Sequence, residues 1–398
     1  MSAPTGQPRR KKPRSRRRFW FRLHGFFSLP VWLLFCFVCL TGTLAVVSHE
    51  LAWLANPAIR ATNPDARPAL PVAELAAAVQ RKVPTADIGY VVLPEPYLAA
   101  HVAFSAAGMP AAIAYVNPYT ADVQAIETGI TFISFMRSLH GWLLAPWQHG
   151  YSAGYYLVSS MAVLLTGALL TGLVVYRKFW RAWLRPTLRW RADARTWLGD
   201  LHRLSGAWSI WFMAVIGLTG LWYLAQAVMW HNGIEYEPES LPMAVQELPL
   251  PATGLPPERL PLATLLAAAG RALPDMQPAW ISLPEHNRDY VTVYGSGDTV
   301  LYDAYAWRVQ VNPWTGAVAG VRTPADMEVL ESLAHIADPL HYGTLGGLWT
   351  KLLWFLFGVL LTGMSLTGFM IWSRRTVGEP GRVAPRRRRR VAGPEGAS

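Results

Sequence analysis

Four of the ten histidines in this sequence recur in a pattern that could bind metal. Each stands at a repeated distance from a threonine, which is 17 residues for His24–Thr41 and His202–Thr219 and 26 residues for His140–Thr166 and His341–Thr367. A neutral imidazole is the side chain that most commonly binds transition metals in proteins. We therefore expect these four histidines to act as ligands if the fold brings them together.

The segments that carry these histidines are strongly apolar. The chain has 398 residues, of which 52% are hydrophobic and 15% are charged, whereas soluble domains contain about 25% charged residues. Four long stretches contain no Asp, Glu, Lys or Arg, namely 23–49, 150–176, 204–231 and 352–373. Because about 20 apolar residues in a helix cross a bilayer, each stretch predicts one transmembrane helix.

The distribution of charge predicts the orientation of these helices. The segments 1–22, 177–203 and 374–398 contain 25 basic and 4 acidic residues, whereas the rest of the chain contains 11 basic and 21 acidic residues. By the positive-inside rule, both termini and the central loop are expected in the cytoplasm. The basic runs 9–18 and 386–390 are then expected to contact lipid headgroups, and the net charge of +11 does not require a nucleic-acid partner.

The chain is also expected to be a tandem duplication. Residues 70–84 (LPVAELAAAVQRKVP) match residues 260–274 (LPLATLLAAAGRALP) at eight of fifteen positions. Each half reads as a span, an external module with one helix (71–82 and 261–273) followed by strands, and a second span. Because both halves start on the same side of the membrane, the repeat is parallel.

These observations predict an α-helical integral membrane protein in which a tandem parallel repeat forms a four-helix transmembrane bundle with two small α+β periplasmic modules. The predicted segments are a cytoplasmic tail (1–22), transmembrane helix 1 (23–49), module 1 (50–139), transmembrane helix 2 with its preceding histidine segment (140–176), a basic cytoplasmic loop (177–203), transmembrane helix 3 (204–231), module 2 (232–340), transmembrane helix 4 with its preceding histidine segment (341–373) and a second cytoplasmic tail (374–398).

Such a bundle would place His24 and His202 together at the cytoplasmic face, and His140 and His341 together at the external face. This arrangement suits two bis-histidine b-type haems, because imidazole is a good axial ligand to haem iron and the apolar macrocycle can lie between helices. Zinc fits less well, since it needs three or four clustered ligands and the acidic residues avoid the spans. We therefore expect these four histidines to bind the irons of two haem b groups.

Some assignments stay open at this point. Four other histidines could replace an external ligand: His49, His231, His149 and His335. Three arginines flank candidate ligands and could bind the haem propionates: Arg22, Arg137 and Arg203. No histidine directly follows Cys36 or Cys39, so covalent attachment of haem is not expected. Thr-Gly pairs recur in every span, and helix packing is sufficient to explain them.

Short motifs around the histidines and in the modules complete the pattern. They are Leu23-His24, Leu139-His140, Leu201-His202-Arg203 and Leu340-His341 in the spans, and VNPYT (116–120) and VNPWTG (311–316) in the modules. Over about residues 20–375 the sequence resembles the PepSY-associated transmembrane family, although Gly25 stands where the first motif of that family has Arg. This family includes iron-regulated inner-membrane proteins similar to siderophore reductases. The resemblance implies that two haems carry electrons to a ferric-siderophore in the periplasm.

The predicted function is transmembrane electron transfer from a cytoplasmic reductant or a membrane quinol to a ferric-siderophore or another periplasmic metal complex. The protein would then be a haem-dependent ferric-siderophore reductase of the bacterial inner membrane. In the alternative interpretation, the spans anchor two modules that bind or inhibit a periplasmic peptidase without redox activity. Coupled ion transport is not expected, because the spans contain no charged residue.

Overall fold

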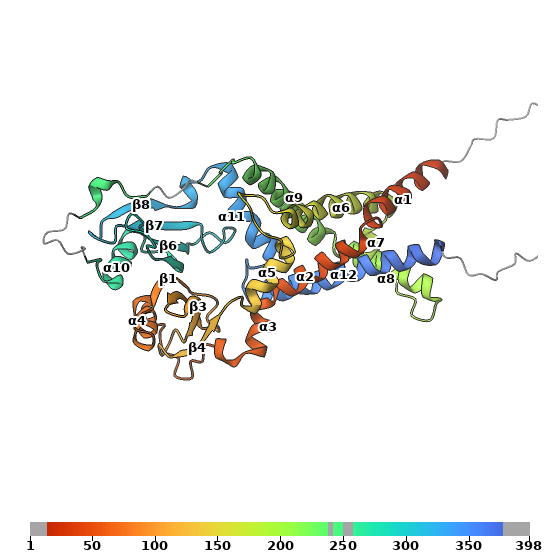
Figure 1. The fold of residues 1–398 in the computed structure, drawn as a ribbon. Coiled ribbons are helices and arrows are strands. Elements are labelled where there is room, and N and C mark those ends of the chain that lie inside the picture. Colours follow the sequence, from red (N-terminus) through yellow and green to blue (C-terminus); the bar gives the residue numbers. More distant parts are fainter. Residues whose placement is uncertain (1–13, 238–241, 250–257, 377–398) are drawn as a thin grey trace, which may run out of the picture.

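The computed structural model describes residues 14–237, 242–249 and 258–376 (Figure 1). Helices form one end of an elongated molecule and a β-sheet forms the other (Figure 1). The start of α1 and the end of α12 both lie at the end opposite the sheet (Figure 1). The basic run 386–390 and the first half of the run 9–18 lie outside the described residues.

Three helices are long and apolar enough to cross a membrane singly, namely α6 (Ala153–Val175), α9 (Ile210–His231) and α12 (Leu348–Thr376). A further crossing would need α1 (Arg14–Ser28) and α2 (Trp32–Val46) together, and these two helices meet at an angle of 62°. Pro30 lies at this break, where its missing N–H and its ring interrupt a helix. The predicted bundle of four transmembrane helices is therefore wrong, because the expected first helix is broken.

Shorter helices connect these elements to the sheet and to one another. They are α3 (Ser48–Ala55), α5 (Phe132–Trp142), α7 (Trp180–Leu184), α8 (Ala194–Trp208) and α11 (Val329–Tyr342), with single 3-10 turns at η1 (Pro57–Ile59), η2 (Val245–Glu247) and η3 (Pro324–Asp326). The α6 helix packs against α1 and α9, and α12 packs against α8 and α2. Helices α5 and α11 lie between the apolar helices and the sheet (Figure 1).

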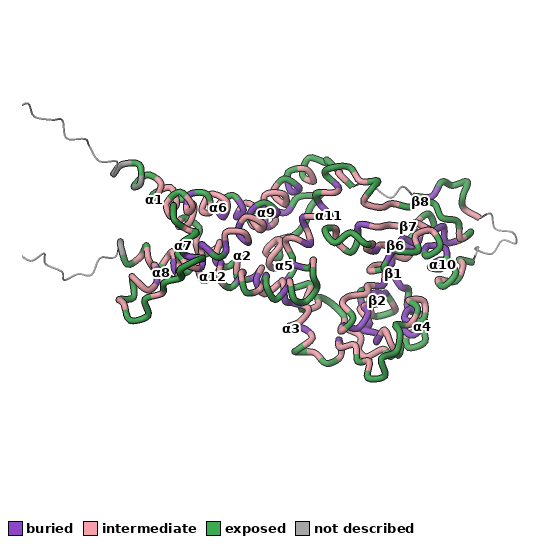
Figure 2. Tube along the Cα trace, turned by 180° about the vertical axis from the view of Figure 1, so that it is seen from behind, coloured by how far each residue is buried: buried purple, intermediate pink, exposed green. Residues whose placement is uncertain are grey.

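The outer surface of the apolar helices is not covered by protein. Leu33, Leu170, Leu218 and Leu356 are all exposed on it. Figure 2 shows the same helices coloured mainly as exposed and intermediate along their length. An uncovered apolar surface of this extent is typical of helices that contact lipid.

One continuous sheet replaces the two separate modules that the sequence predicted. Its eight antiparallel strands have the order β4-β3-β2-β1-β5-β6-β7-β8. The strands are β1 (Asp87–Val92), β2 (Ala100–Ala106), β3 (Met109–Val116), β4 (Val123–Thr128), β5 (Gln277–Ser282), β6 (Val291–Ser296), β7 (Trp307–Val311) and β8 (Val318–Arg322). Each half contributes a four-stranded meander, so the predicted modules are wrong as independent units.

The two halves join where β1 pairs with β5. Val91 lies opposite Ile281, and both are fully buried. The N–H of Leu93 donates to the carbonyl of Ala279, and the N–H of Leu283 donates to the carbonyl of Gly89, both at 2.8 Å. These two bonds are equivalent under the repeat, so a pseudo-twofold axis passes between Val91 and Ile281. Each meander thereby covers the otherwise unpaired edge of the other.

The helices of the two meanders cover one face of the sheet. The α4 helix (Val72–Lys82) and the α10 helix (Leu262–Ala272) start directly after a proline, which confirms the two predicted helices to within one residue. Leu75 and Val79 of α4 and Leu265 of α10 belong to one buried apolar cluster with strands from both halves. This shared core joins the two meanders into one structural unit next to α5 and α11 (Figure 1).

Candidate functional site

The structure brings the four predicted histidines together in two pairs. The rings of His24 on α1 and His202 on α8 have their centroids 6.5 Å apart. The rings of His140 on α5 and His341 on α11 are 6.3 Å apart. An imidazole nitrogen binds a first-row metal ion at about 2.0 Å, so two rings on opposite sides of one ion have their centres about 6 Å apart. Both pairs have this separation.

Each pair takes one histidine from each half of the chain. Helices α1 and α8 hold corresponding places in the two halves, and so do α5 and α11. The first pair lies toward the end of the helices opposite the sheet, and the second lies in the layer between the helices and the sheet (Figure 1). A single half could supply only one imidazole to either site, so the duplication itself creates the two pairs.

A threonine from a neighbouring helix contacts Nδ1 of every one of these imidazoles. The Nδ1–Oγ1 distances are 3.1 Å for His24 and Thr171, 3.3 Å for His140 and Thr41, 3.1 Å for His202 and Thr367, and 2.8 Å for His341 and Thr219. All four threonines belong to the Thr-Gly pairs of the apolar helices. In each case the threonine and the histidine come from the same half of the chain.

The groups around Nδ1 favour one tautomer of these rings. Each of these threonines donates its only hydroxyl proton to a carbonyl of its own helix, as in Thr171 to Gly167 at 2.6 Å and Thr219 to Val215 at 2.8 Å. With its proton placed in this way, the threonine oxygen accepts a hydrogen bond from an Nδ1–H group. The carbonyl of Ala168, which can only accept, also lies 3.1 Å from Nδ1 of His24. A neutral ring protonated at Nδ1 has its free lone pair on Nε2, and no group among the described residues bonds Nε2 of these four histidines.

Three glycines of these Thr-Gly pairs lie beside an imidazole, and one of them leaves space that a side chain would fill. A Cβ atom on Gly42 would lie 2.7 Å from Cε1 of His140, which is too close for any side chain. A Cβ atom on Gly172 or Gly368 would lie 3.4 Å from the ring of His24 or His202. Gly220 instead packs against the neighbouring helix α6, since a Cβ atom there would lie 2.8 Å from Cβ of Ala162. The interpretation of these pairs as helix packing was therefore incomplete, because all four threonines contact a ring and Gly42 leaves space for one.

The structure also corrects one repeated spacing. The sequence matched Thr166 with Thr367, but the threonine that corresponds to Thr367 in its contact with histidine is Thr171. The hydroxyl of Thr166 is buried without a hydrogen-bond partner. The segment between α5 and α6 has ten residues and the segment between α11 and α12 has five, so equal spacing from the histidine selects the wrong threonine.

The donor set at each pair consists of two imidazoles. Within the described residues, no group of three or more His, Cys, Asp or Glu side chains could hold a metal ion. A zinc ion would need about four protein or water ligands. Two imidazoles with free Nε2 atoms fit a metal whose other ligands belong to a macrocycle, as in haem.

The alternative histidines have other partners. His49 on α3 contacts Glu95 at 3.1 Å, His335 on α11 contacts Asp303 at 3.0 Å, and His231 at the end of α9 contacts the hydroxyl of Tyr156 at 3.2 Å. His149 is exposed in the segment between α5 and α6. The structure does not bring any of these four into the two histidine pairs.

The arginines proposed to flank the ligands have different surroundings. Arg22 is exposed on α1, two residues before His24. Arg137 is exposed on α5, one turn before His140. Arg203 on α8 forms an ion pair with Asp200. Cys36 and Cys39 are free thiols on α2.

Sequence reasoning missed a buried ion cluster between module 1 and α12. Lys351, in the first turn of α12, is almost fully buried and pairs with Glu50 of α3 at 3.2 Å and with Glu95. Burial raises the pKa of Glu95, but His49 and Lys351 outweigh this effect and hold the pKa well below its usual range. The only signal in the sequence was a lysine directly before an apolar stretch.

A second missed group lies beside His341. The ring of Tyr223 on α9 packs against His341 with a centroid distance of 4.9 Å, and its hydroxyl donates to Asp338 at 2.8 Å. Burial raises the pKa of Asp338 to about 6. A carboxyl group that can gain or lose a proton near neutral pH therefore lies one turn from a histidine of the second pair.

The chain matches a known protein family. Residues 8–375 match the family described as the PepSY-associated TM region. A comparison with curated proteins finds no match. The match covers nearly all of the chain, and together with the three apolar helices it indicates a membrane protein.

Proposed function

Because the chain belongs to the PepSY-associated transmembrane family, we propose that it transfers electrons across the bacterial inner membrane with two bis-histidine b-type haems. His24 and His202 bind one haem, and His140 and His341 bind the other. The electron donor is a cytoplasmic reductant or a membrane quinol. The acceptor is a periplasmic ferric-siderophore or a similar metal complex, on the side of the sheet.

The observation that carries this proposal is the shared orientation of the four imidazoles. Each has Nδ1 bonded to a threonine and Nε2 free, and the rings lie in pairs 6.5 and 6.3 Å apart. A ligating histidine is usually held in this way by a hydrogen bond at its other ring nitrogen. Helix packing alone would not require all four paired histidines to have a hydroxyl group at Nδ1 and a free Nε2.

Haem bound at each pair supplies one-electron redox chemistry. The chain contributes the rest of the site: the histidines hold the iron, the threonines keep the rings in one tautomer, and the apolar helices exclude water. One pair lies on α1 and α8 and the other on α5 and α11, nearer the sheet (Figure 1). Haems held at both places would allow an electron to pass between the two ends of the helical part.

The choice of acceptor rests on charge and on iron chemistry. Outside the three basic segments, the chain contains 21 acidic and 11 basic residues, which favours a neutral or cationic complex over an anionic one. One electron converts Fe(III) to Fe(II). Hard oxygen ligands bind this softer ion less tightly, so reduction releases iron from a siderophore.

Haem content tests the proposal. Detergent-purified protein is expected to contain two haems per chain and to give a bis-histidine reduced-minus-oxidised spectrum. Single variants at His24, His202, His140 or His341 to Ala should each lose one haem. His286→Ala is the matched control, because His286 is exposed in a loop away from both pairs, and it should retain two.

Substrate reduction is tested separately. Protein reduced without oxygen is mixed with a ferric-siderophore and a chelator specific for Fe(II), and both haem oxidation and Fe(II) capture are followed. The wild type should show both signals. A purified protein without haem would refute electron transfer and favour the anchored peptidase-binding module.

A further inference from the structure

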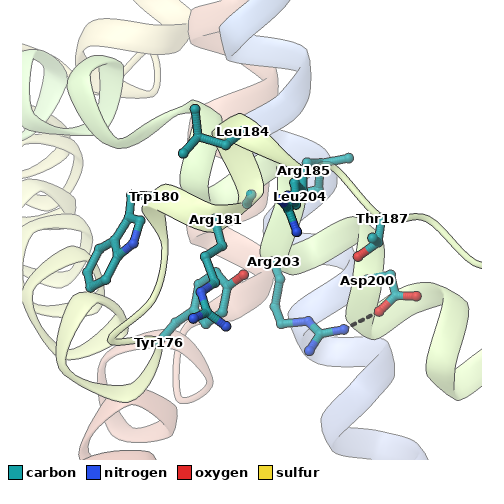
Figure 3. A pocket seen from close by; sticks show the side chains of 10 residues that line it. Tyr176, Trp180, Arg181, Leu184, Arg185, Thr187, Asp200, Arg203 and Leu204 are labelled. Carbon is teal, nitrogen blue, oxygen red and sulfur yellow. Dashed lines mark hydrogen bonds and ion pairs between the residues drawn. The ribbon is translucent and has the colours of Figure 1, made fainter.

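A pocket of about 610 Å³ is lined by residues at the end of α6, in α7 and the segment that follows it, and in α8 (Figure 3). Helices α7 and α8 lie at the end of the molecule opposite the sheet (Figure 1). The side chains that matter for the chemistry of this cavity are Tyr176, Trp180, Arg181, Leu184, Arg185 and Arg203.

The cavity carries positive charge that no nearby carboxylate balances. Its single acidic side chain, Asp200, is buried and accepts two hydrogen bonds from the guanidinium of Arg189, at 2.8 and 2.9 Å. It accepts another from Arg203 (Figure 3). In the described part of the chain, the guanidinium groups of Arg181 and Arg185 have no hydrogen bond or ion pair. The cavity therefore suits a ligand with several anionic oxygens, since guanidinium binds phosphate and carboxylate in a fork geometry.

The wall of this cavity is held in place by tertiary contacts. The indole N–H of Trp183 donates to the carbonyl of Ala207 at 3.0 Å, and that of Trp208 donates to the carbonyl of Ala182 at 3.3 Å. The two indole rings also stack. These contacts bind α7 to α8, so Arg181 and Arg185 are presented from a fixed support.

The rim of the cavity is apolar and uncovered. Trp180 is 51% exposed and Leu184 is 79% exposed, and both line the cavity. Exposed tryptophans beside arginines at a helix end are typical of a membrane–water interface. The ligand should therefore combine an anionic head with an apolar part, which excludes a free nucleotide or a simple phosphate ion as the best occupant.

The cavity is separate from the proposed haem contacts on α8. Asp200, Arg203 and Leu204 are three and four residues apart and share one helix face. His202 instead contacts Thr367 of α12. An anion in the cavity would lie on another face of α8 from that histidine.

We propose that this cavity binds the phosphate of an anionic phospholipid, with Arg181, Arg185 and Arg203 around the headgroup and the acyl chains beside Trp180 and Leu184. Basic pockets at the ends of transmembrane helices bind such headgroups. The proposal does not depend on whether the histidine pairs hold haem.

Native mass spectrometry of the full chain in detergent tests this site. Bound phosphatidylglycerol is counted as the lipid is titrated, with phosphatidylcholine as a zwitterionic comparison and inorganic phosphate as a competitor. The variant Arg181→Gln/Arg185→Gln removes both free guanidiniums. The control Arg191→Gln/Arg195→Gln removes the same charge from two exposed positions, one just before α8 and one in its first turn, that do not line the cavity.

The wild type and the control should each bind one phosphatidylglycerol tightly, and the cavity variant should bind it at least about tenfold more weakly, which is the effect of losing one charge-assisted hydrogen bond. Phosphatidylcholine should bind more weakly than phosphatidylglycerol, and inorganic phosphate should compete poorly. If the cavity variant and the control lost the same amount of affinity for phosphatidylglycerol, the proposal would be overturned. The lipid would then be attracted by the total positive charge of this region and not by the cavity. Efficient competition by phosphate would overturn it in favour of a simple anion site.

Discussion

At the scale of single residues, a threonine hydroxyl group at Nδ1 orients each of the four paired histidines. Thr171 and Thr219 accept from Nδ1 because their own protons are already donated to helix carbonyls. The ring can then present only Nε2 as a base. Four repetitions of this contact, two in each half, give the site its regularity.

Replacing a ligand-orienting threonine should weaken cofactor binding. Thr171→Val on α6 keeps the shape of the side chain but removes the hydroxyl contact with His24, whose Nδ1 then has only the carbonyl of Ala168 as a partner. Loss of such a contact behind a metal ligand typically costs about 10–100-fold in affinity. The measurement is haem retention during titration with a competing apo-haem-binding protein, together with the midpoint potential of each haem.

Thr166→Val is the matched control on the same helix, because Thr166 also precedes a glycine but contacts no histidine. On α12 the same comparison is Thr367→Val against Thr362→Val, since Thr362 donates only to Gly358 of its own helix. Similar effects of both members of a pair would mean that these threonines act through helix packing alone.

Asp338 should give the stability a distinct pH dependence. Its pKa is raised to about 6 from 3.8 by burial, so the folded state binds more protons than the unfolded state between these values. The contribution of Asp338 to the free energy of unfolding is therefore fully present below about pH 4 and is lost as the pH rises through 6. Thermal unfolding of Asp338→Asn should lack this decline, and a constant difference from wild type between pH 4 and 7 would contradict the assignment.

At the scale of elements, charged side chains connect the sheet to the apolar helices. Lys351 reaches from the first turn of α12 to Glu50 and Glu95, which belong to the other half of the chain. The hydroxyl of Tyr97 donates to Glu50 at 2.7 Å and completes this cluster. A buried ion pair of this kind specifies which surfaces meet, even where its net contribution to stability is small.

Removing the buried ammonium should destabilise the protein strongly. Lys351→Met leaves two carboxylates near one another without their cation, and breaking a buried pair in this way costs about 3–5 kcal/mol. Thermal unfolding in detergent measures the effect. Lys351→Met/Glu95→Gln should recover part of the loss, and the exposed control Arg81→Met should change the free energy of unfolding by no more than about 0.5 kcal/mol.

At the scale of the whole molecule, the two halves of the duplication contact each other in two regions. The β1–β5 pairing joins the two meanders, and the two histidine pairs join the two sets of helices. Both junctions lie between equivalent parts of the repeat. The sheet therefore helps to hold α5 and α11, and with them His140 and His341, in register.

The junction of the sheet can be tested at its axis. Ile281→Ala removes a fully buried side chain opposite Val91, and such a change in a core costs about 2–5 kcal/mol. Val321→Ala, on the exposed surface of the outer strand β8, should have almost no effect. Hydrogen exchange should show faster opening of both β1 and β5 in the Ile281 variant, and opening of β5 alone would mean that the two meanders fold independently.

Much of this arrangement could be predicted from local patterns. The repeat at 70–84 and 260–274 located the helices α4 and α10, and the apolar stretches located α6, α9 and α12. The paired placement of His24 with His202 and of His140 with His341 also followed from the repeat. Pro30, where the first apolar stretch breaks into two helices, is itself a signal in the sequence.

The sequence by itself determined the residue types, the periodicity and the duplication, because each depends on neighbours along the chain. Only the tertiary structure decided that β1 pairs with β5, that Thr171 rather than Thr166 meets a histidine, and that Lys351 is buried against Glu95. The backbone groups of an edge strand accept any antiparallel partner, and loop lengths shift one helix along another. Strand pairing, the position of one helix along another and the burial of a side chain all depend on contacts between residues far apart in the chain. A pattern of neighbouring residues does not contain this information.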